Sequence, residues 1–540
     1  MPHDSLVALF ESSCRSFASL PALTSFGTTL SFRQWNNLSL RFARYLQDLG
    51  LTRGMRLAIM MPNLLQYPVV VVGALRAGLS VINVNPLFTP RELAQELADS
   101  RPDVIVILEN FAHVLSRISP AQQPRHIILS RIGDLLPFPK RWLIHCQLRL
   151  HRKVPPYQLA KTLPLREALH STPPSPSPIK LKPEDTAFLQ YTGGTTGTPK
   201  AAMLSHGNVL ANVEQCRLWL TCKDWPKPIR PGAEKLITAL PLYHIFALTA
   251  NLWVGLAIGM HNHLIADPKD ANALIRVLKR SRFTCITGVN TLFDHLLITP
   301  GFEQVDFSQL RLTLAGGMPT RRMVADRWQQ VTGCPVVEGY GLTEASPVVT
   351  LNPLDIEAFT GSIGVPLPGT DCRIRDNEHW LPAEQRGELC IRGPQVMQGY
   401  WNRPDESRAI FTEDGWLRTG DIARMDAEGF FYIIDRKKDM IIVSGFNVYP
   451  REIEEVVAEH PGVRECAAVG LPDPRTGETV KIYVVKSDPG LTEAELSAWC
   501  RERLTAYKRP RYIEFCQTLP KSAVGKVLRH RLRRSNSPKP

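Results

Sequence analysis

Short apolar runs alternate with amphipathic stretches through the first half of the chain. Residues 30–50 (LSFRQWNNLSLRFARYLQDLG) space their apolar side chains with the period of a helix, which ends at Gly50. The runs RLAIMMPN, VINVNP, DVIVILE, HIILS, KLITALPL and TCITGVN read as strands or as strands with a following turn. Because short apolar strands that alternate with helices form largely parallel sheets, this pattern predicts an α/β fold.

The most apolar early stretch, Tyr67–Val84, is interrupted by Arg76 and Gly78. It predicts a buried helix that leads into a strand, not a membrane span. The opening residues, MPHDSLVALFESSCRSF, lack the basic start and long apolar run of a signal peptide. We therefore expect a cytoplasmic protein.

The pattern changes near residue 435, where the charged run Asp435–Asp439 separates the strands FFYII and MIIVSG. Beyond it we predict helices at 451–460 and 493–504 and strands at CAAVGLP and TVKIYVVK, a compact α+β module of about a hundred residues. A charged break between apolar strands indicates a domain boundary. The predicted organisation is a large N-terminal domain of parallel-rich sheets flanked by helices, with a β-subdomain, at residues 1–434. A joining segment at 435–438 and a small C-terminal domain at 439–540 follow.

Composition narrows the choice of partners. A chain of 540 residues exceeds one typical domain, and 44% hydrophobic with 21% charged residues fits a globular protein. The net charge of +13 suits nucleotides, coenzymes, acidic lipid surfaces or nucleic acid, but no basic–aromatic array supports nucleic acid. Eleven scattered cysteines without a CxxC pair argue against a zinc site or a disulfide framework and suit a reducing compartment.

One basic, aliphatic segment, residues 139–158 (PKRWLIHCQLRLHRKVPPYQ), has two interpretations. On a helix its apolar side chains share one face, with arginines and Lys153 around it. We favour an ordinary surface helix docked on the core. The alternative is peripheral contact with an anionic inner-membrane surface. The shared face consists of Trp142, Leu143, Cys146 and Leu150.

The stretch YTGGTTGTPK at 191–200 combines three glycines, four threonines and a lysine without an acidic residue. Backbone N–H groups, hydroxyls and a cation suit a loop wrapped around phosphate oxygens. It differs from the P-loop because Pro199 precedes the lysine and Ala201 follows it. A surface turn is the plainer alternative. The candidate phosphate-binding residues are Tyr191, Thr192, Gly193, Gly194, Thr195, Thr196, Gly197, Thr198 and Lys200.

Further candidates follow predicted strands, where ligands bind in open α/β sheets. His244 lies in PLYHIF, although a lone histidine is more often structural. The turns LAGGMP and EGYGLTE add an aromatic face, a hydroxyl and a carboxylate. Glu344 beside phosphates indicates a divalent cation, and Mg²⁺ takes such ligands. Asp421 in LRTGD could accept the hydroxyls of a ribose, while Lys526 stands beside a glycine in a basic tail.

These blocks, in this order and spacing, resemble the adenylate-forming superfamily of acyl-CoA synthetases, peptide-synthetase adenylation domains and beetle luciferases. The blocks are YTGGTTGTPK, GYGLTE, LRTGD, DRKKDMIIVSGFNVYP and PKSAVGKVLR, and the resemblance covers almost the full chain. Within the superfamily, MPNLLQYPV, INVNPL, ALPLYHIFALT, TGVNTLF and GPQVMQGYW are most similar to the bacterial long-chain fatty acid–CoA ligases.

The resemblance implies a two-step reaction that feeds fatty acid activation and β-oxidation. A fatty carboxylate attacks the α-phosphate of MgATP to give acyl-AMP and pyrophosphate, and the thiol of CoA then displaces AMP. ATP and CoA are thus co-substrates, with Mg²⁺ as the metal. Because a carboxylate and a phosphate repel each other, charge neutralisation and positioning should dominate catalysis.

The resemblance also implies roles for individual residues. The loop Thr192–Lys200 holds the β- and γ-phosphates. Gly317, Gly339 and Tyr340 border adenine, Thr343 contacts the α-phosphate, Glu344 binds Mg²⁺, and Asp421 and Arg436 hold the ribose. Lys526 approaches the α-phosphate and the acyl carboxylate, and His244 lies near the thioester-forming centre. The acyl pocket is assigned to Phe246, Val289 and Gly316.

In that family the small C-terminal domain rotates between the two steps. Lys438 matches the hinge position, and rotation would withdraw Lys526 and bring the loop at Gly445 toward the pantetheine channel. Ala201 departs from the family pattern, in which many members carry glycine after the lysine. If that position requires a positive φ, alanine costs on the order of 1 kcal/mol.

The sequence leaves alternative functions open. One is a medium-chain or aryl acid–CoA ligase, because a single sequence does not reveal the acyl tunnel. Another is a non-catalytic nucleotide- or acyl-binding relative. The joint retention of Lys200, Glu344, Asp421, Arg436 and Lys526 speaks against it, because binding alone would not require all five. The oligomeric state is open, with a homodimer as one option.

Overall fold

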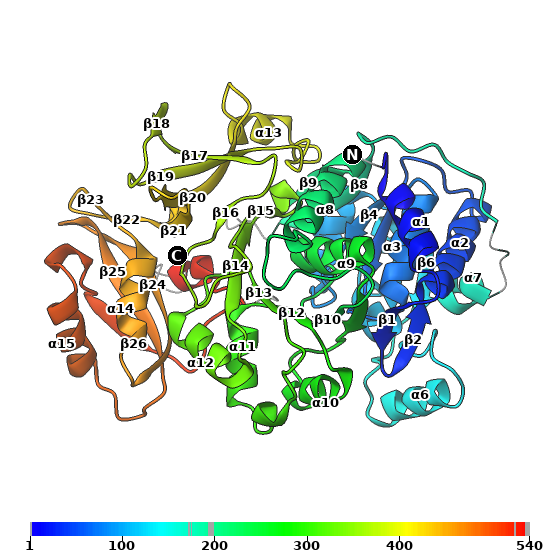
Figure 1. Cartoon of the computed structure of the whole chain (residues 1–540), viewed down its shortest axis with the longest axis horizontal. Helices are drawn as coiled ribbons and strands as arrows, with labels where there is room; N and C mark the ends of the chain where they lie inside the picture. Colours follow the sequence, from blue (N-terminus) through cyan, green and yellow to red (C-terminus); the bar gives the residue numbers. More distant parts are fainter. Residues whose placement is uncertain (1–2, 171–172, 174, 193–198, 523–524, 535–540) are drawn as a thin grey trace. The chain divides into compact units, whose positions relative to one another are not determined.

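The computed structural model in Figure 1 describes residues 3–170, 173, 175–192, 199–522 and 525–534. The chain divides into two compact units. The first comprises Met1–Thr370 with Arg392–Ile410, and the second comprises Asp371–Ile391 with Phe411–Pro540. Each unit is an assembly of sheets and helices, and the predicted α/β class is confirmed.

Seven strands of the first unit, counted over its described residues, form a sheet in the order β7-β6-β5-β3-β4-β8-β9. All neighbours are parallel except β8 and β9. β4 and β5 are buried along their whole length, as in parallel sheets covered on both faces. The bounds are β3 Arg56–Met60, β4 Ser80–Asn83, β5 Val104–Leu108, β6 His126–Ser130, β7 Thr162–Pro164, β8 Thr186–Thr192 and β9 Lys200–Ser205.

A second sheet of the same unit has the order β16-β15-β14-β13-β12-β10-β11-β1-β2 within the described ranges. Its centre, from β14 to β1, is parallel. The predicted strands KLITALPL and TCITGVN are β10 and β12. The bounds are β1 Pro21–Ser25, β2 Thr28–Ser31, β10 Lys235–Thr238, β11 His261–Leu264, β12 Cys285–Gly288, β13 Leu312–Ala315, β14 Val336–Gly341, β15 Val348–Leu351 and β16 Val365–Pro366.

Helix α3, Gln66–Arg76, is buried at every residue, which fits its apolar side chains on all sides. It leads into β4, so the buried helix and strand predicted for Tyr67–Val84 are confirmed. The turn before it joins the two sheets, because Asn63 Nδ2 donates to the carbonyls of Thr238 and Leu240 at 3.1 and 2.8 Å. Tyr67 likewise donates to the carbonyl of Leu242 at 3.0 Å.

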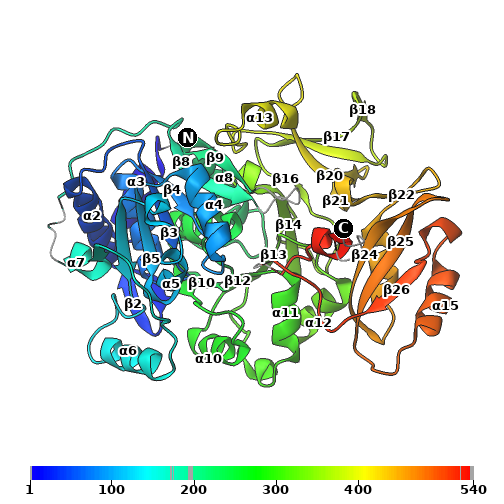
Figure 2. The same ribbon diagram turned by 180° about the vertical axis from the view of Figure 1, so that it is seen from behind.

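Other helices of the first unit cover the sheets. α4 and α5 pack on one face of the seven-stranded sheet, as the view from behind shows (Figure 2). The helix predicted to end at Gly50 is α2, which begins after a capping box at Ser31 and Gln34. The bounds are α1 Leu6–Ser16, α2 Phe32–Asp48, α4 Pro90–Ser100, α5 Ala112–Leu115, α6 Lys140–Leu150, α7 Leu165–His170, α8 His206–Leu220, α9 Val254–Ile258, α10 Ala271–Ser281, α11 Asn290–Ile298, α12 Arg322–Thr332 and α13 Pro404–Ile410.

The second unit contains two smaller sheets. One has the order β18-β17-β19-β20-β21, and the other has the order β23-β22-β25-β24 with β26 beside β25, over the residues described. The latter sheet packs with α14 and α15 around its own apolar core, which confirms the elements predicted beyond residue 450. The bounds are β17 Asp371–Asp376, β18 His379–Leu381, β19 Gly387–Arg392, β20 Leu417–Met425, β21 Phe431–Arg436, β22 Ile441–Val443, β23 Phe446–Val448, β24 Val463–Asp473, β25 Gly477–Lys486, β26 Tyr512–Phe515, α14 Pro450–Ala458, α15 Glu493–Arg503 and α16 Arg529–Arg534.

The basic segment at 139–158 contains the surface helix α6, Lys140–Leu150. None of the residues of α6 is buried, and the predicted apolar face of Trp142, Leu143, Cys146 and Leu150 is exposed. The half-buried side chains belong to the other face, which includes Ile144, His145 and Leu148. The favoured surface helix docked on the core is therefore present, but the face that docks is not the apolar face identified from the sequence. Over the described ranges, none of the helices is both long and apolar enough to cross a bilayer.

Candidate active site

The candidate residues of the first unit follow the carboxyl ends of strands from both of its sheets. Tyr191 and Thr192 end β8, and the loop of His244 follows β10. Gln190 joins them, because its side-chain amide donates to the carbonyl of Tyr243 at 2.9 Å and accepts from Asn83 Nδ2 at 2.9 Å. The strand ends of the two sheets are thus joined by a direct hydrogen bond.

The ends of the glycine-rich stretch are fixed by strand pairing. Thr192 lies opposite Lys200 in the antiparallel pair of β8 and β9, and its hydroxyl donates to the carbonyl of Lys200 at 3.3 Å. The ammonium of Lys200 forms an ion pair with Glu406 and lies 5.5 Å from the centre of the Tyr400 ring. The candidate residues Gly193, Gly194, Thr195, Thr196, Gly197 and Thr198 lie outside the described residues.

Tyr191 is anchored by a residue that the sequence did not single out. Its hydroxyl donates to Asp99 Oδ2 at 2.7 Å, while Arg403 donates to Asp99 Oδ1 at 2.9 Å. Trp401 Nε1 also donates to the main-chain carbonyl of Asp99 at 3.3 Å. Burial, with the Asp99 carboxylate beside it, raises the pKa of Tyr191 far above its usual value. Tyr191 therefore remains a hydrogen-bond donor that fixes the start of the loop.

Ala201, the departure from the family pattern, has no backbone penalty here. It lies within β9, is fully buried and pairs with Tyr191. Its φ is not positive. The condition under which alanine would cost free energy is therefore not met at this position, and the methyl group packs into the apolar core beside β8.

Glu344 belongs to the short 3₁₀ turn η5, Thr343–Ala345, which follows β14. Tyr400 donates its hydroxyl proton to Glu344 Oε1 at 2.7 Å. Burial and the Glu344 carboxylate raise the pKa of Tyr400 well above its usual value, so the donor stays protonated. The backbone N–H of Met397 donates to the carbonyl of Glu344 at 2.8 Å and fixes the turn.

The Glu344 carboxylate fits a magnesium ion that is shared with phosphates. A carboxylate has two oxygens with about four acceptor sites, so the bond from Tyr400 leaves coordinating capacity. Magnesium is usually held by one or two carboxylates together with substrate phosphates. The residues that the structure describes contain no cluster of three or more His, Cys, Asp or Glu that could hold a metal ion.

Three strand ends of the nine-stranded sheet bring the candidate pocket residues together. Val289 caps α11 after β12, and Gly316 and Gly317 follow β13. A Cβ on Gly316 would lie 3.2 Å from both the ring of Phe246 and the carbonyl of Gly339. Gly317 has a φ of 76°, and a Cβ there would lie 3.9 Å from Val289. The glycines thus allow a close approach of backbone, ring and neighbouring strand.

The remaining candidates on this side are near the same edge. His244 Nδ1 accepts a hydrogen bond from the backbone N–H of Phe246 at 3.3 Å, which orients the ring. Tyr340 and Thr343 are half-buried in β14 and η5. The first unit therefore places the described candidates for phosphate, adenine, acyl and metal binding on neighbouring loops.

The second unit assembles the other candidates. Asp421, buried on β20, forms an ion pair with Arg436 at the end of β21, with 2.6 Å between Oδ1 and Nε. Burial and then Arg436 lower the pKa of Lys526 to about 8, partly offset by Asp421. Asp421, Arg436 and Lys526 are therefore one electrostatic group, although more than a hundred residues separate Asp421 from Lys526.

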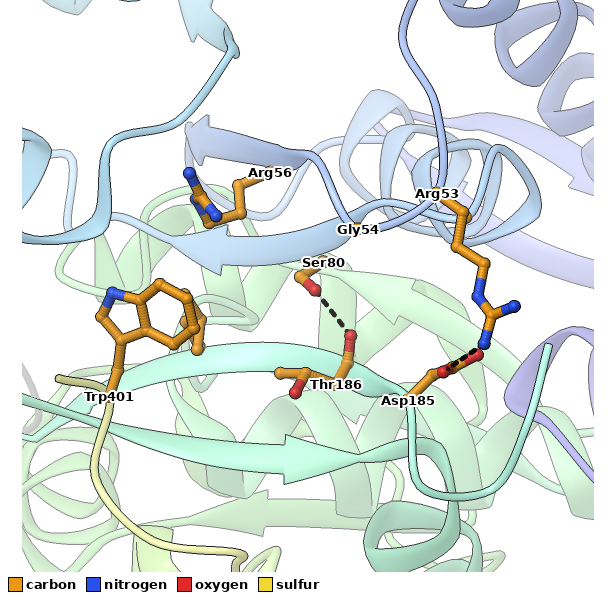
Figure 3. Close-up of a pocket in the computed structure, with 9 residues that line it drawn as sticks. Arg53, Gly54, Arg56, Ser80, Asp185, Thr186 and Trp401 are labelled. Carbon is orange, nitrogen blue, oxygen red and sulfur yellow. Dashed lines mark hydrogen bonds and ion pairs between the residues drawn. The ribbon is translucent and has the colours of Figure 1, made fainter. Parts of the chain in front are cut away.

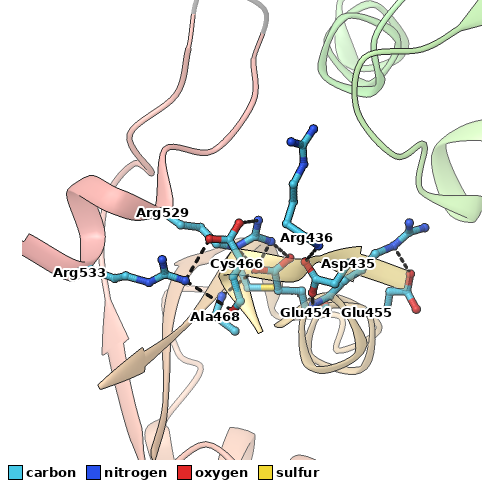
Figure 4. A network of polar contacts seen from close by, with 10 residues as sticks. Asp435, Arg436, Glu454, Glu455, Cys466, Ala468, Arg529 and Arg533 are labelled. Atoms are coloured by element: carbon cyan, nitrogen blue, oxygen red, sulfur yellow. Dashed lines mark hydrogen bonds and ion pairs between the residues drawn. The ribbon is translucent and has the colours of Figure 1, made fainter. Parts of the chain in front are cut away.

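Lys526 stands in a tight loop. Backbone bonds join Leu528 to Pro520 and Ser522 to Lys526, each at 2.8 Å. The loop is also tied to α14, because Arg529 donates from one nitrogen to both carboxylate oxygens of Glu454 at 2.7 Å (Figure 4). Charge-assisted bonds of this kind are strong and directional.

The segment that contains Lys438, the hinge candidate, belongs to the same network. Lys438 lies in the 3₁₀ turn η6, Lys437–Asp439, and Asp439 accepts from Arg533 at 3.0 Å. Gly445 has a φ of 81° in the turn between β22 and β23, where it meets no neighbouring side chain. The roles of Lys438 and Gly445 in a rotation stay predictions.

A separate cavity of about 170 Å³ opens at the other ends of the strands (Figure 3). Arg56, Ser80 and Thr186 line it, and they are the first residues of β3, β4 and β8. Its arginines have partners: Arg53 pairs with Asp185 at 2.6 Å, and Arg56 donates to the carbonyl of Arg101 at 3.1 Å. The cavity therefore does not belong to the candidate site.

Asp99, Tyr400 and Glu406 are the contacts that sequence reasoning missed. Tyr400 lies in GPQVMQGYW, which the resemblance already included, so this segment offered a signal without a role. Asp99 and Glu406 lie on α4 and α13, whose charged residues look like ordinary helix surfaces in the sequence. Only the tertiary contacts single them out.

Comparison with known proteins supports the same arrangement. The AMP-binding enzyme family matches residues 10–401, and the AMP-binding enzyme C-terminal domain matches residues 452–526. A long-chain-fatty-acid–CoA ligase of Escherichia coli is 51% identical, and the similarity covers 98% of this chain and 94% of that protein. Two solved structures each cover 98% of both chains. ATP-bound MatB from Rhodopseudomonas palustris has a TM-score of 0.81 at 28% identity, and the o-succinylbenzoate CoA synthetase of Bacillus subtilis with its acyl-adenylate intermediate has 0.80 at 26%.

Proposed function

We propose that this chain, which belongs to the AMP-binding enzyme family, is a long-chain fatty acid–CoA ligase. It converts ATP, a fatty acid and CoA to AMP, pyrophosphate and acyl-CoA through an acyl-adenylate. The observation that carries the proposal is the 51% identity to a ligase of this specificity over 98% of the chain. The product would feed fatty acid activation and β-oxidation.

In the first step, a carboxylate oxygen of the fatty acid attacks the α-phosphorus of ATP. The bond from that phosphorus to the bridging oxygen breaks, and pyrophosphate leaves with the electron pair. Lys200 and Thr192 would hold the leaving phosphates, and Thr343 would contact the α-phosphate. Magnesium bound at Glu344 would neutralise phosphate charge. Fixed donors at the developing charge lower this barrier most effectively.

Lys526 would supply a cation between the two reacting anions. Its pKa of about 8 keeps most of the population protonated at pH 7, despite its burial. Arg436 and Asp421 would bind the two hydroxyls of the ribose, and their ion pair supports a fixed orientation of the Arg436 side chain. The geometry of the second unit supports this assignment because all three groups influence one another.

In the second step, the thiolate sulfur of CoA attacks the acyl carbonyl carbon, and the carbon–oxygen bond to AMP breaks. His244 would lie near this centre. A rotation of the C-terminal domain about Lys438 would withdraw Lys526 and bring the loop of Gly445 toward the thiol. The boundaries at 434 and 439 belong to this proposal.

Phe246, Val289 and Gly316 would line the acyl pocket. The close packing of the Phe246 ring over Gly316 supports a specificity role, because one extra carbon there would collide with ring and backbone. A medium-chain or aryl acid–CoA ligase is the alternative within the same chemistry. A non-catalytic relative is disfavoured by the full-length similarity to ligases.

Pyrophosphate release tests the proposal. We expect release with ATP, Mg²⁺ and fatty acids of 12 to 18 carbons, faster than with octanoate or an aryl acid, and acyl-CoA only when CoA is present. Faster turnover of an aryl acid would favour the alternative. If no acid supports pyrophosphate release, the proposal that the protein is a ligase is rejected.

We further propose a cytoplasmic location, with peripheral membrane contact, and a homodimer. All eleven cysteines are free, and most are buried or half-buried, which suits a reducing compartment. Sedimentation equilibrium of the purified protein tests the dimer, and a single monomer mass across concentrations would reject it.

A further inference from the structure

Helix α6 presents large apolar side chains to solvent. Trp142, Leu143 and Leu150 are 58%, 51% and 80% exposed, and Phe138 just before the helix is 75% exposed. Side chains of this size are normally scattered singly over a surface. Here four of them lie within the thirteen residues from Phe138 to Leu150, one just before α6 and three on its exposed face.

The opposite face of α6 rests on the first unit. A Cβ on Gly133 would lie 2.8 Å from both Arg141 and His145, so these side chains cover that glycine. Burial lowers the pKa of His145, aided by the charge of Arg131. The helix is therefore held by the face of Arg141, Ile144, His145 and Leu148, and its larger apolar face is turned to solvent, contrary to the usual arrangement.

A second segment extends the apolar surface. Phe26 is 44% exposed in the turn between β1 and β2, and a Cβ on its neighbour Gly27 would lie 3.0 Å from Lys140 Nζ. The turn lies beside α6 in both views (Figures 1 and 2). Phe26 and Gly27 are the two central residues of this hairpin turn, which accounts for the positive φ of each, 47° and 64°.

The segment that carries this surface is basic. Seven basic residues and no acidic residue occur from Leu135 to Arg166. Arg149, Arg152 and Lys153 are exposed at the end of α6. An exposed apolar face surrounded by cations matches an anionic bilayer, in which aromatic side chains enter the interface and cations meet headgroups.

We infer that Phe26 and the segment 138–153 form a docking surface for an anionic lipid bilayer. An acidic protein partner would match the charge, but it would not favour so many separate apolar side chains projecting from a convex helix. The inference rests on the proposed function only for the biological purpose of docking. Long-chain fatty acids concentrate in bilayers, and docking would place the enzyme at its substrate.

Cosedimentation of the full chain with vesicles tests the inference. We expect wild type to bind vesicles of phosphatidylglycerol and phosphatidylcholine at least tenfold more tightly than phosphatidylcholine alone. Trp142→Ser/Leu143→Ser/Leu150→Ser and, separately, Arg149→Gln/Arg152→Gln/Lys153→Gln should each reduce binding at least fivefold. The matched control is Leu87→Ser/Ile298→Ser, which removes two equally exposed apolar side chains elsewhere and should bind as wild type does. Pyrophosphate release with octanoate checks that each variant is folded.

A probe on Cys146 reports the same event locally. Cys146 lies on the outward face and is exposed, whereas the other ten cysteines are buried or half-buried. A polarity-sensitive maleimide there should shift its emission to the blue on anionic vesicles, and Cys146→Ser should abolish the labelling. Wild type that ignores anionic vesicles, variants that bind unchanged, or a probe that stays in water while the protein binds would each overturn the inference. Because vesicle binding needs no ATP, none of these results would bear on the ligase reaction.

Discussion

Tyr400 donates a hydrogen bond of 2.7 Å to Glu344, a residue 56 positions earlier in the chain and the predicted magnesium ligand. The bond fixes one carboxylate oxygen and leaves coordinating capacity on the other. Tyr400 also lies beneath Lys200, 5.5 Å from its ammonium. A single aromatic residue thus contacts both the metal ligand and the phosphate-binding cation of the proposed site.

Removing this hydroxyl should impair adenylation. A hydrogen bond to a charged group contributes about 1.5–3 kcal/mol, so Tyr400→Phe should lower kcat/KM for ATP by roughly 10- to 100-fold. The Mg²⁺ concentration for half-maximal pyrophosphate release should rise, because the carboxylate loses its orientation. Tyr432→Phe is the matched control, since Tyr432 donates to Asp426 at 3.0 Å in the second unit. An unchanged Mg²⁺ requirement would argue against a metal at Glu344.

For the ion pair between Lys200 and Glu406 we predict the opposite effect: removing the carboxylate should strengthen ATP binding. ATP must draw the Lys200 ammonium away from Glu406, and the pair is partly exposed, so its contribution is about 0.2–1 kcal/mol. Glu406→Gln should therefore tighten ATP binding by about 1.5- to 5-fold. Equilibrium binding of ATP to the variant measures this directly. Weaker binding would mean that Glu406 positions Lys200 and does not compete with ATP.

Lys526 should make adenylation sensitive to alkaline pH. Burial and Arg436 lower its pKa to about 8, so the cation is present below that pH and lost above it. Adenylation kcat/KM should fall about tenfold per pH unit above pH 8, because this parameter reports the free enzyme. Lys526→Arg, which stays protonated, should lose activity overall but keep a flat profile to pH 10.

The same residue separates the two half-reactions. Lys526→Ala should lose pyrophosphate release far more than thioester formation from supplied acyl-AMP, because the cation is proposed to serve only the first step. Single-turnover assays of each half-reaction compare the losses. Equal loss in both would contradict this division of labour.

Much of the fold could be predicted because local pattern and tertiary role agree. β5 lies within the predicted run DVIVILE, and α3 with β4 covers Tyr67–Val84, since apolar strands and buried helices carry their signal in their own residues. For α6 the pattern identified the helix and its apolar face correctly. Periodicity shows which side chains share a face, but not whether that face points to the core or to solvent. Only the structure shows that this face points to solvent.

The candidate site, too, could be predicted only in part from the sequence. Motifs supplied Lys200, Glu344, Asp421 and Lys526, because phosphate and ribose chemistry requires those groups. Their supporting contacts could not be predicted: Asp99 lies 92 residues from Tyr191, and no local pattern connects them. Such contacts depend on which helix packs beside which loop.

The packing of Gly316 against Phe246 carries a prediction on chain length. A Cβ on Gly316 would lie 3.2 Å from the Phe246 ring and 3.2 Å from the fixed carbonyl of Gly339. Of these two neighbours only the ring can shift, and we expect the shift to narrow the proposed acyl pocket. Gly316→Ala should lower kcat/KM for hexadecanoate at least tenfold more than for octanoate, whose shorter chain leaves the deep part of the pocket empty. Phe246→Leu in the same chain should restore much of the loss, because the smaller side chain admits the methyl group. A panel of acids from 8 to 18 carbons measures the selectivity. Equal loss across the panel, or no recovery in the double variant, would place the acyl chain elsewhere.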